Sequence, residues 1–390
     1  MARHNMAHVQ AGTIDQEPEV LRVPASNYFD DTRWQAEMAA VFKRMPLMLA
    51  MSCELPKAGD YKTMEVARVP LLLVRQEDGA VRALINSCSH RGAVIALEPH
   101  GNAKRFACPY HAWTYNTGGD LIGVLSEQDF GAVDKSCHGL TRLPVAERAG
   151  MIWASLDPKS VLDIDAFLCS YDDLLNHFGF VDWHLFSRRT IAGPNWKIAY
   201  DGYMDLYHLP VLHKNTFGPG MPNRALYDAY GPHQRVSSPN PGLLGLGNVP
   251  ESEWQTEHLM GGVWTIFPHV SIASFDGGGP SVMVSQLFPG NSPQESITVQ
   301  SYLMKNPPVD EAAVEAANKQ FDLLEYVVRE EDYATGLRQQ GALMSGAKSH
   351  VMFGRNEGGG HRFHRWVDAL IATADADLPA LFARGAGGNV

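Results

Sequence analysis

Apolar residues recur at helical spacing in the segment Tyr28–Arg44, where Trp34, Met38 and Phe42 follow one another at steps of four. This spacing places the three side chains on one face and predicts an amphipathic helix that packs on the rest of the chain. Residues 1 to about 20 have no such period, and they predict a loosely ordered arm.

The pattern then changes, and Leu47–Pro158 consists of short apolar runs separated by Gly, Pro and Asp-Gly. Two of these runs, Val69–Val74 and Val81–Ile85, flank Glu77–Ala80, whose Asp-Gly pair is a hairpin signal. Asn116–Gly119 has the composition of a second turn. This region is therefore predicted to form a small antiparallel β domain.

Beyond residue 158 the chain contains segments with helical spacing of apolar residues and segments with short apolar runs typical of strands. Helical spacing is found near 161–178, near 196–213 and from Asp310 to Gln340. Apolar runs predict strands near 183–192, 261–276, 280–289 and 295–304. The segment 218–252 is rich in Gly, Pro and Asn and has no period, so it is expected to be a long loop, either an active-site cover or a mobile surface segment.

Charge and composition exclude several classes of function. The 390 residues are 45% hydrophobic and carry a formal net charge of −11. No basic cluster is visible, which argues against nucleic acid or an anionic membrane as a partner. No run approaches the roughly 18 apolar residues of a membrane span, so we expect a soluble cytoplasmic protein.

Two Cys/His pairs are the first candidate for chemistry. Cys88 and His90 are separated by one residue, seventeen residues follow, and Cys108 and His111 are separated by two. Thiolate and imidazole ligands together suit a tetrahedral zinc ion or a [2Fe–2S] cluster with two Cys on one iron and two His on the other. Zinc knuckles usually have two or more residues between paired ligands, so the first pair favours the cluster.

The pattern C-x-H-x17-C-x2-H, with Arg91-Gly92 after the first pair and Trp113 after the second, resembles the Rieske motif of Rieske non-heme iron ring-hydroxylating oxygenases (large subunit). The resemblance implies that a Rieske [2Fe–2S] cluster is held by Cys88, His90, Cys108 and His111. Imidazoles in place of two thiolates raise the potential of such a cluster. The other cysteines are then expected to be buried or free thiols in a reducing compartment: Cys53, Cys137 and Cys169.

A second set of metal-ligand residues lies about a hundred residues downstream. Asp205, His208 and His213 have the spacing D-x2-H-x4-H, and two imidazoles are part of the ligand set of a mononuclear iron(II) site. On a straight helix the two histidines would diverge by about 140°, so facing one ion requires a break, for which Pro210 supplies a reason. Taken alone, the spacing fits two packed or exposed histidines equally well. After a Rieske motif it resembles the catalytic motif of the same family.

The third ligand should be a carboxylate on the last long helix. Its inward-facing apolar stripe is Val314, Ala317, Phe321, Leu324 and Val328. Continuing by four residues gives Asp332 and continuing by three gives Glu331, so periodicity leaves both open. The resemblance of Glu331-Asp332 and the following Gln-Gly to the family's segment implies that Asp332 is the ligand. His361 and His364 are weaker candidates.

Two further residues are candidates for catalytic roles, Asp205 and Asn195. Asp205 lies one helical turn before His208 and is expected to accept a hydrogen bond from its free ring N–H. In the family the matching Asp also bridges to a cluster-ligand histidine of the neighbouring subunit, which corresponds here to His90 or His111. The family usually has Glu-Asn where this chain has Asp201-Gly202. The resemblance therefore implies no role for the side chains at these two positions.

The resemblance covers residues 28 to 366 approximately and implies an α+β fold. Residues 1–45 would be an arm and helix packing on the catalytic domain, 46–157 an all-β Rieske domain, and 158–390 a helix-grip catalytic domain with an antiparallel sheet, related to START and Bet v1-like folds. A homotrimer is implied, in some members with added small subunits.

The implied function is the terminal oxygenase component of a multicomponent Rieske system with mononuclear Fe(II). No nucleotide-binding glycine fingerprint or flavin motif is present, so electrons from NAD(P)H must arrive through a separate ferredoxin or reductase. No Lys or Arg lies between Val236 and Met304, which favours hydroxylation of a neutral, apolar aromatic or cyclic molecule. Alternatives are O- or N-demethylation, a Rieske electron-transfer protein, and a ligand-binding helix-grip protein with a zinc-stabilised insert.

Overall fold

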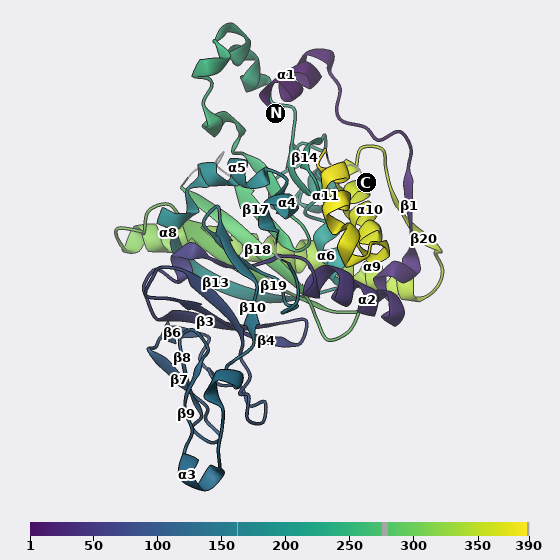
Figure 1. The fold of residues 1–390 in the computed structure, drawn as a ribbon. Helices are drawn as coiled ribbons and strands as arrows, with labels where there is room; N and C mark the ends of the chain where they lie inside the picture. The colour runs from purple at the N-terminus through teal and green to yellow at the C-terminus, as the bar shows by residue number, and fades with distance from the viewer. Residues whose placement is uncertain (162, 275–279, 388–389) are drawn as a thin grey trace. The chain divides into compact units, whose positions relative to one another are not determined.

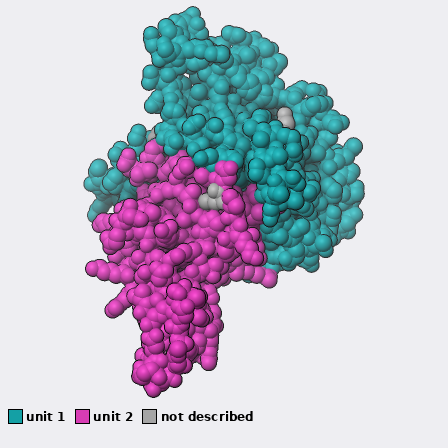
Figure 2. All heavy atoms as spheres, viewed as in Figure 1, with its two compact units in different colours: residues 1–41, 165–178, 183–390 teal, residues 42–164, 179–182 magenta. Residues whose placement is uncertain are grey.

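The computed structural model of this chain divides into two units (Figures 1 and 2). One of them, unit 2, consists mainly of strands and the turns between them. The structure describes residues 1–161, 163–274, 280–387 and 390. Unit 1 comprises Met1–Val41, Asp165–Phe178 and Trp183–Val390, and unit 2 comprises Phe42–Ile164 and Gly179–Asp182. The segment 46–157 falls within unit 2, although the domain boundaries themselves stay predictions.

The strands described in unit 2 form antiparallel sheets. A five-stranded sheet has the order β10-β5-β4-β3-β6, from Arg142–Leu143, Val81–Ile85, Val69–Arg75, Asp60–Val66 and His100–Asn102. A second sheet, β11-β12-β2, consists of Val145–Arg148, Met151–Ala154 and Leu47–Met51. A third, β7-β8-β9, consists of Arg105–Ala107, Thr114–Asn116 and Leu121–Gly123, and the short helix α3 (Glu127–Phe130) follows it.

Turn chemistry sets the register of both predicted hairpins. Between β4 and β5, the N–H of Ala80 donates to the Asp78 carboxylate over 2.9 Å and Gly79 has a φ of +84°. Between β8 and β9, the N–H of Asp120 donates to the Asn116 side chain over 2.8 Å. Asp and Asn side chains commonly close turns in this way. Both hairpins are confirmed by their strand pairing.

A seven-stranded antiparallel sheet is the centre of unit 1, with the order β13-β19-β18-β17-β16-β15-β14. In that order the strands are His184–Gly193, Ser296–Met304, Ser281–Pro289, Val270–Ser274, Gly262–Ile266, His233–Ser237 and Leu226–Tyr230. The strands predicted in this region are confirmed, and the prediction at 261–276 is realised as β16 and β17. Positions 275 and 276 lie outside the described residues.

One face of this sheet is covered by a long helix. It consists of α8 (Glu311–Tyr326), the π-helical η10 (Val327–Tyr333) and α9 (Ala334–Met344), which confirms the helix predicted from Asp310 to Gln340. Tyr302 of β19 stacks on Phe321 of α8, with 5.2 Å between ring centroids. Thr298 lies on the same face of β19, because side chains alternate along a strand, and it hydrogen-bonds Tyr333 of η10.

The remaining helices of unit 1 are shorter. They are α1 (Ala2–Ala11), α2 (Asp31–Glu37), α5 (Tyr171–Leu175), α6 (Trp196–Asp201), α7 (Leu209–Leu212), α10 (Gly358–Ala372) and α11 (Leu378–Gly385). The helix predicted over Tyr28–Arg44 is found as α2 followed by π-helical η2 (Met38–Lys43), and α4 (Ile164–Leu168) with α5 realises the prediction at 161–178. Outside the main sheet, β1 (Leu21–Pro24) pairs with β20 (His350–Phe353). The expected α+β class is confirmed.

Two expectations for polar segments are wrong. The arm predicted at residues 1 to 20 contains α1, whose Asn5 is buried and donates to the Ser238 carbonyl over 3.0 Å. The loop predicted at 218–252 contains β14, β15 and the 3-10 helix η7 (Pro241–Asn248). In β15 the polar Arg235 is buried through an ion pair with Asp228 at 3.1 Å, a contact that hydropathy does not reveal.

No helix among the described residues combines the length and the hydropathy that a membrane span would need.

Candidate metal centres

Two loops of unit 2 carry the first predicted ligand set. Cys88 and His90 lie between β5 and β6, and Cys108 and His111 lie between β7 and β8. In each loop the cysteine N–H donates to the carbonyl five residues further on over 2.8 Å, and the cysteine carbonyl accepts from the N–H four residues further on. The two loops therefore share one backbone hydrogen-bond pattern around their cysteines.

The thiols of this set are buried and the imidazoles lie nearer the surface. Cys88 and Cys108 are 3% and 4% exposed and belong to the hydrophobic core of the unit. His90 and His111 are half-buried, with ring centroids 4.7 Å apart. The Nδ1 atom of His111 is buried and makes no hydrogen bond, which is costly for a ring nitrogen unless it binds a metal. These observations fit a cluster with its cysteine side inward.

Tyr115 is a contact of the predicted cluster loop that the residue spacing does not identify. Its hydroxyl lies 3.2 Å from Sγ of Cys88 and accepts from the N–H of Ser89 over 3.1 Å. Burial raises the pKa of Tyr115 to about 12, so the phenol keeps its proton and can donate to a cysteine thiolate. Hydrogen bonds to cluster sulfurs are one means by which proteins set the reduction potential.

In unit 1 the two predicted histidine ligands flank a single-turn helix. Helix α6 ends at Asp201, the chain turns through residues 202–208, and α7 begins at Leu209. His208 is the N-cap of α7 and His213 is its C-cap. Pro210 stands in the first turn of α7, where proline is tolerated. The role predicted for Pro210 is therefore wrong, because the break comes before His208.

Asp332 of η10 completes a convergent triad with these histidines. Its Oδ1 lies 3.2 Å from Nε2 of His213 and 3.8 Å from Nε2 of His208, and the three ligand atoms lie within 4.8 Å of one another. Two imidazoles and a carboxylate around one point are the donor set of non-heme iron(II). The structure brings the three predicted residues together, and their role as ligands stays a prediction.

Both imidazoles of the triad are held from behind by carboxylates. Asp205 Oδ1 lies 2.9 Å from Nδ1 of His208, the contact predicted for it. Glu331 Oε2 lies 2.6 Å from Nδ1 of His213, and its Oε1 accepts from the Thr216 hydroxyl over 2.6 Å. A carboxylate on the second ring nitrogen orients a metal-binding imidazole and increases its basicity. Glu331, the rival to Asp332, therefore lies on the opposite side of His213 from the triad.

The charges around the triad favour a cation. Burial opposes protonation of His208, but Asp205 and Asp332 outweigh it, so the pKa of His208 is raised. Burial likewise opposes protonation of His213, and Asp332 with Glu331 raises its pKa. The negative charge that favours protonation of these imidazoles also stabilises a divalent cation. The donor set and its surroundings therefore fit Fe(II).

A cavity of about 250 Å³ opens beside the triad. Its lining includes Asp205, His208 and Asp332, together with the acidic Asp201 and Glu357. Asp205 uses Oδ1 for both the N–H and the Nδ1 of His208. Within the described part of the chain, its Oδ2 makes no hydrogen bond. This carboxylate oxygen is available to a group that enters the cavity.

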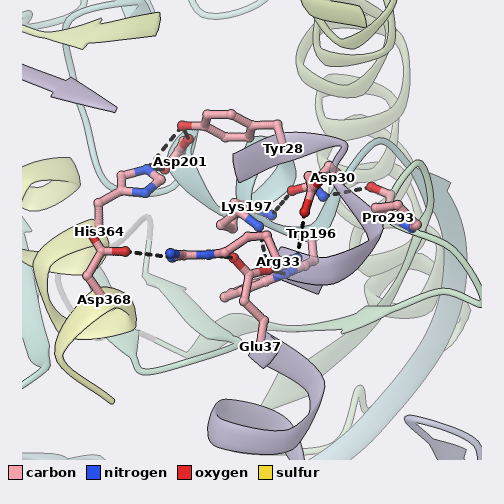
Figure 3. A network of polar contacts seen from close by, with 11 residues as sticks. Tyr28, Asp30, Arg33, Glu37, Trp196, Lys197, Asp201, Pro293, His364 and Asp368 are labelled. Carbon is pink, nitrogen blue, oxygen red and sulfur yellow. Dashed lines mark hydrogen bonds and ion pairs between the residues drawn. The ribbon is translucent and has the colours of Figure 1, made fainter. Parts of the chain in front are cut away.

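Helix α6, which precedes the ligand turn, is anchored by a buried ion pair (Figure 3). Lys197 pairs with Glu37 of α2, and both side chains are fully buried. Glu37 also accepts from Nε1 of Trp196 over 2.9 Å and from Nε of Arg33 over 2.7 Å. These contacts fix α6 against α2 without any part in the metal chemistry.

The other end of α6 is held by a second group of contacts in Figure 3. Asp201 accepts from the Tyr28 hydroxyl over 3.0 Å and lies 3.0 Å from Nε2 of His364. Nε2 of His361 lies 3.0 Å from the carbonyl of Gly354. Both C-terminal histidines are thus engaged away from the triad.

Asn195 begins α6 as its N-cap. Its side-chain oxygen accepts from the N–H of Lys197 over 2.9 Å, and its amide donates to the Pro293 carbonyl over 2.6 Å. Asn195 is fully buried. Its contacts are those of a helix cap, a common role for Asn, and the catalytic role predicted for it stays a prediction.

Two family models match separate parts of the chain. The Rieske [2Fe-2S] domain matches residues 45–135, and the ring hydroxylating alpha subunit (catalytic domain) matches residues 180–373. The Cys/His loops fall in the first range and the triad in the second.

Several characterised proteins are similar to this chain. The biphenyl 2,3-dioxygenase subunit alpha of Rhodococcus jostii is 33% identical over 190 residues, which cover 46% of this chain and 41% of that protein. The glycine betaine monooxygenase oxygenase subunit of Chromohalobacter salexigens is 31% identical over 193 residues, 49% of this chain and 43% of that protein. The matched region thus spans less than half the length of these two relatives.

Likeness to solved structures extends over nearly the whole chain. The quaternary ammonium Rieske monooxygenase CntA in complex with L-carnitine has a TM-score of 0.77 at 22% identity, covering 91% of this chain and 97% of that one. At this identity the likeness shows the fold.

Proposed function

Because the chain belongs to the Rieske oxygenases, carrying both the Rieske [2Fe–2S] domain and the catalytic domain of a ring-hydroxylating alpha subunit, we propose that it is the terminal oxygenase component of a multicomponent system. It receives electrons that originate in NAD(P)H from a separate ferredoxin or reductase and uses O2 to oxidise a small organic molecule. The observation that carries this proposal is the convergence of His208, His213 and Asp332, with a carboxylate behind each imidazole.

When bound, the cluster passes on single electrons and the mononuclear iron activates O2. The chain's own residues orient and tune the ligands. Asp205 and Glu331 accept the Nδ1–H of His208 and His213, which keeps each Nε2 lone pair directed toward Asp332. In unit 2, Tyr115 supplies a hydroxyl next to the Cys88 sulfur.

Electron transfer between subunits is proposed to pass through Asp205. In a homotrimer, with or without added small subunits, its carboxylate would accept a hydrogen bond from His90 of the partner subunit or His111 of the partner subunit. The position of Asp205 supports this route, since its Oδ1 already binds His208 and the residue lines the acidic cavity.

The proposed substrate is a neutral aromatic or cyclic molecule, which would be mono- or dihydroxylated. The lack of Lys and Arg between Val236 and Met304 supports a substrate without a carboxylate. A second candidate is oxidation or N-demethylation of a quaternary ammonium compound, favoured by the similarity to the glycine betaine monooxygenase subunit. The same lack of cationic side chains is compatible with a cationic substrate.

Iron analysis and O2 uptake together test the proposal. The purified protein should contain about three irons per chain, two in the cluster and one at the triad. With the cluster chemically reduced, O2 should be consumed and a product formed in the presence of a substrate from a panel of aromatic and quaternary ammonium compounds. About two irons per chain and no O2 consumption would instead identify an electron-transfer protein, and a colourless zinc protein would identify a ligand-binding one.

A further inference from the structure

A second convergent set of metal-ligand atoms lies on the N-terminal arm of unit 1, away from both predicted centres in sequence. His4 and His8 are four residues apart on α1 and therefore share one face. The chain reverses at Gly12, the left-handed C-cap of α1 with a φ of +66°, and returns Asp15 to that face. Nε2 of His4 and Nε2 of His8 lie 2.9 and 3.0 Å from the same Asp15 Oδ1.

Each of the three side chains is also held on its other side. Nδ1 of His4 lies 3.3 Å from Oδ1 of Asp228, and Nδ1 of His8 lies 2.9 Å from Oγ1 of Thr13. Oδ2 of Asp15 accepts from the N–H of Tyr227 over 2.7 Å. An oxygen acceptor on the second nitrogen of each imidazole is the usual support of metal-binding histidines. The carboxylate on Nδ1 of His4 resembles those behind His208 and His213, whereas His8 has a hydroxyl in this position.

We propose that His4, His8 and Asp15 form a second mononuclear metal site that takes a divalent transition-metal ion of the zinc class. The three ligand atoms lie within 4.8 Å of one another, and imidazole with carboxylate suits zinc, which such a site binds more tightly than Fe(II) in the general order of affinities. The side chains are 35%, 21% and 26% exposed. A fourth position is therefore open to solvent, as in three-ligand zinc sites that carry a water.

An ion at this site would join the arm to the main sheet. Asp15 and His4 contact residues of β14, through the Tyr227 N–H and the Asp228 carboxylate. Arg224 adds a hydrogen bond to the Gly12 carbonyl over 2.7 Å. A metal ion that binds only when residues 2–15 are folded against the sheet stabilises this fold. The expected function of the ion is therefore structural: it would hold residues 2–15 against the β14–β15 edge.

A proton is the competing occupant. Hydrogen bonds to Asp228 and Asp15 raise the pKa of His4 to about 9, so at neutral pH an ion must displace a proton from this ring. A purely protonic network would satisfy the contacts of His4 without any metal. Binding measurement decides between the two.

The test uses the iron-loaded chain of residues 1–390 and Zn²⁺ alone. The protein is dialysed to equilibrium against buffered Zn²⁺ at micromolar free concentration, and zinc and iron are both counted per chain. The unmodified protein should bind about one zinc without losing iron, and His8→Gln and Asp15→Asn should each lose that zinc. His177→Gln is the matched control, because His177 is an exposed histidine of the same unit, and it should retain the zinc.

Two results would overturn the proposal. One is equal zinc content in the unmodified protein, His8→Gln and Asp15→Asn, which would leave a proton as the only occupant. The other is zinc uptake matched by an equal loss of iron, which would assign the zinc to the triad. The iron count at the triad verifies folding of unit 1 in every variant, because the triad belongs to the same unit as the arm, and the visible absorption of the cluster verifies unit 2. Because neither His8 nor Asp15 belongs to the proposed oxygenase site, O2 consumption tests the oxygenase proposal separately.

Discussion

Replacement of Glu331 and Asp332, one at a time, tests the division of labour between these neighbouring carboxylates. Asp332→Ala removes the proposed ligand, whose Oδ1 lies 3.2 Å from Nε2 of His213, so the mononuclear iron and O2-dependent turnover should be lost. Glu331→Ala removes the partner of Nδ1 and of the Thr216 hydroxyl but no proposed ligand. Loss of such a partner typically weakens metal binding about 10- to 100-fold, or about 1.4–2.7 kcal/mol. Iron should therefore be retained at saturating concentration and lost more readily to a chelator.

Thr216→Val and Glu330→Ala provide a weaker change and a control against which the loss of iron affinity in Glu331→Ala can be compared. Thr216 donates to Oε1 of Glu331, whereas Oε2 of Glu331 makes the contact with His213, so Thr216→Val should weaken iron binding less than Glu331→Ala does. Glu330 is an exposed neighbour on the same helix that pairs with Arg329, and its removal should leave iron binding unchanged. Mononuclear iron is measured by chelator competition, and the cluster by its absorption and EPR signal. The cluster should be intact in all four variants, because its predicted ligands lie in unit 2.

Either of two outcomes would contradict these roles of Glu331 and Asp332. Loss of all mononuclear iron in Glu331→Ala, with iron and turnover retained in Asp332→Ala, would mean that the ligand and the orienting residue are exchanged. Chelator sensitivity of Glu331→Ala equal to that of Glu330→Ala would mean that the contact with Nδ1 of His213 contributes nothing to iron affinity.

Three further predictions follow from the same geometry. Cys88→Ala should remove the visible chromophore and destabilise unit 2, because a cluster that binds only the folded state stabilises it; full colour with an unchanged EPR signal would exclude Cys88 as a ligand. Asp205→Asn should keep both metals, a reducible cluster and the oligomer while losing nearly all turnover, and cluster reoxidation by O2 and substrate at the unmodified rate would rule out the bridge. Lys197→Met should lower the free energy of unfolding by about 3 kcal/mol, the lower end of the range for a broken buried ion pair. The lower end is expected because Glu37 keeps its contacts with Arg33 and Trp196. A loss below about 1 kcal/mol in urea unfolding would contradict this value.

The candidate ligands could be found in the sequence because metal chemistry restricts residue type and because the ligands come in local groups. Cys88 and His90 share one loop, and His208 and His213 flank one short helix. Such groups are visible as spacings even where the path of the chain is not known. The path itself was only partly predictable, as Pro210 shows. It lies at the start of α7 instead of breaking a longer helix.

Segments held by distant polar partners could not be predicted. Gln234 of β15 is buried and bonds to Arg362 of α10, and Asn5 of α1 is buried against residues 238 and 240. Each of these residues looks like part of a polar loop when only its neighbours in sequence are considered. The helix α1 and the hairpin β14–β15 therefore did not appear in the hydrophobic pattern, although strands with apolar residues did.

The choice between Glu331 and Asp332 shows a further limit of periodicity. On an α-helix consecutive side chains point about 100° apart, so only one of two neighbouring residues would be expected to reach a given partner. Here both reach His213, because its two ring nitrogens lie on different sides of the ring: Glu331 lies 2.6 Å from Nδ1 and Asp332 lies 3.2 Å from Nε2. Both residues belong to the π-helical segment η10, and π-helical turns often occur at functional sites. A helical stripe can therefore identify the turn that faces the iron site, but the ligand is decided by which nitrogen each carboxylate meets.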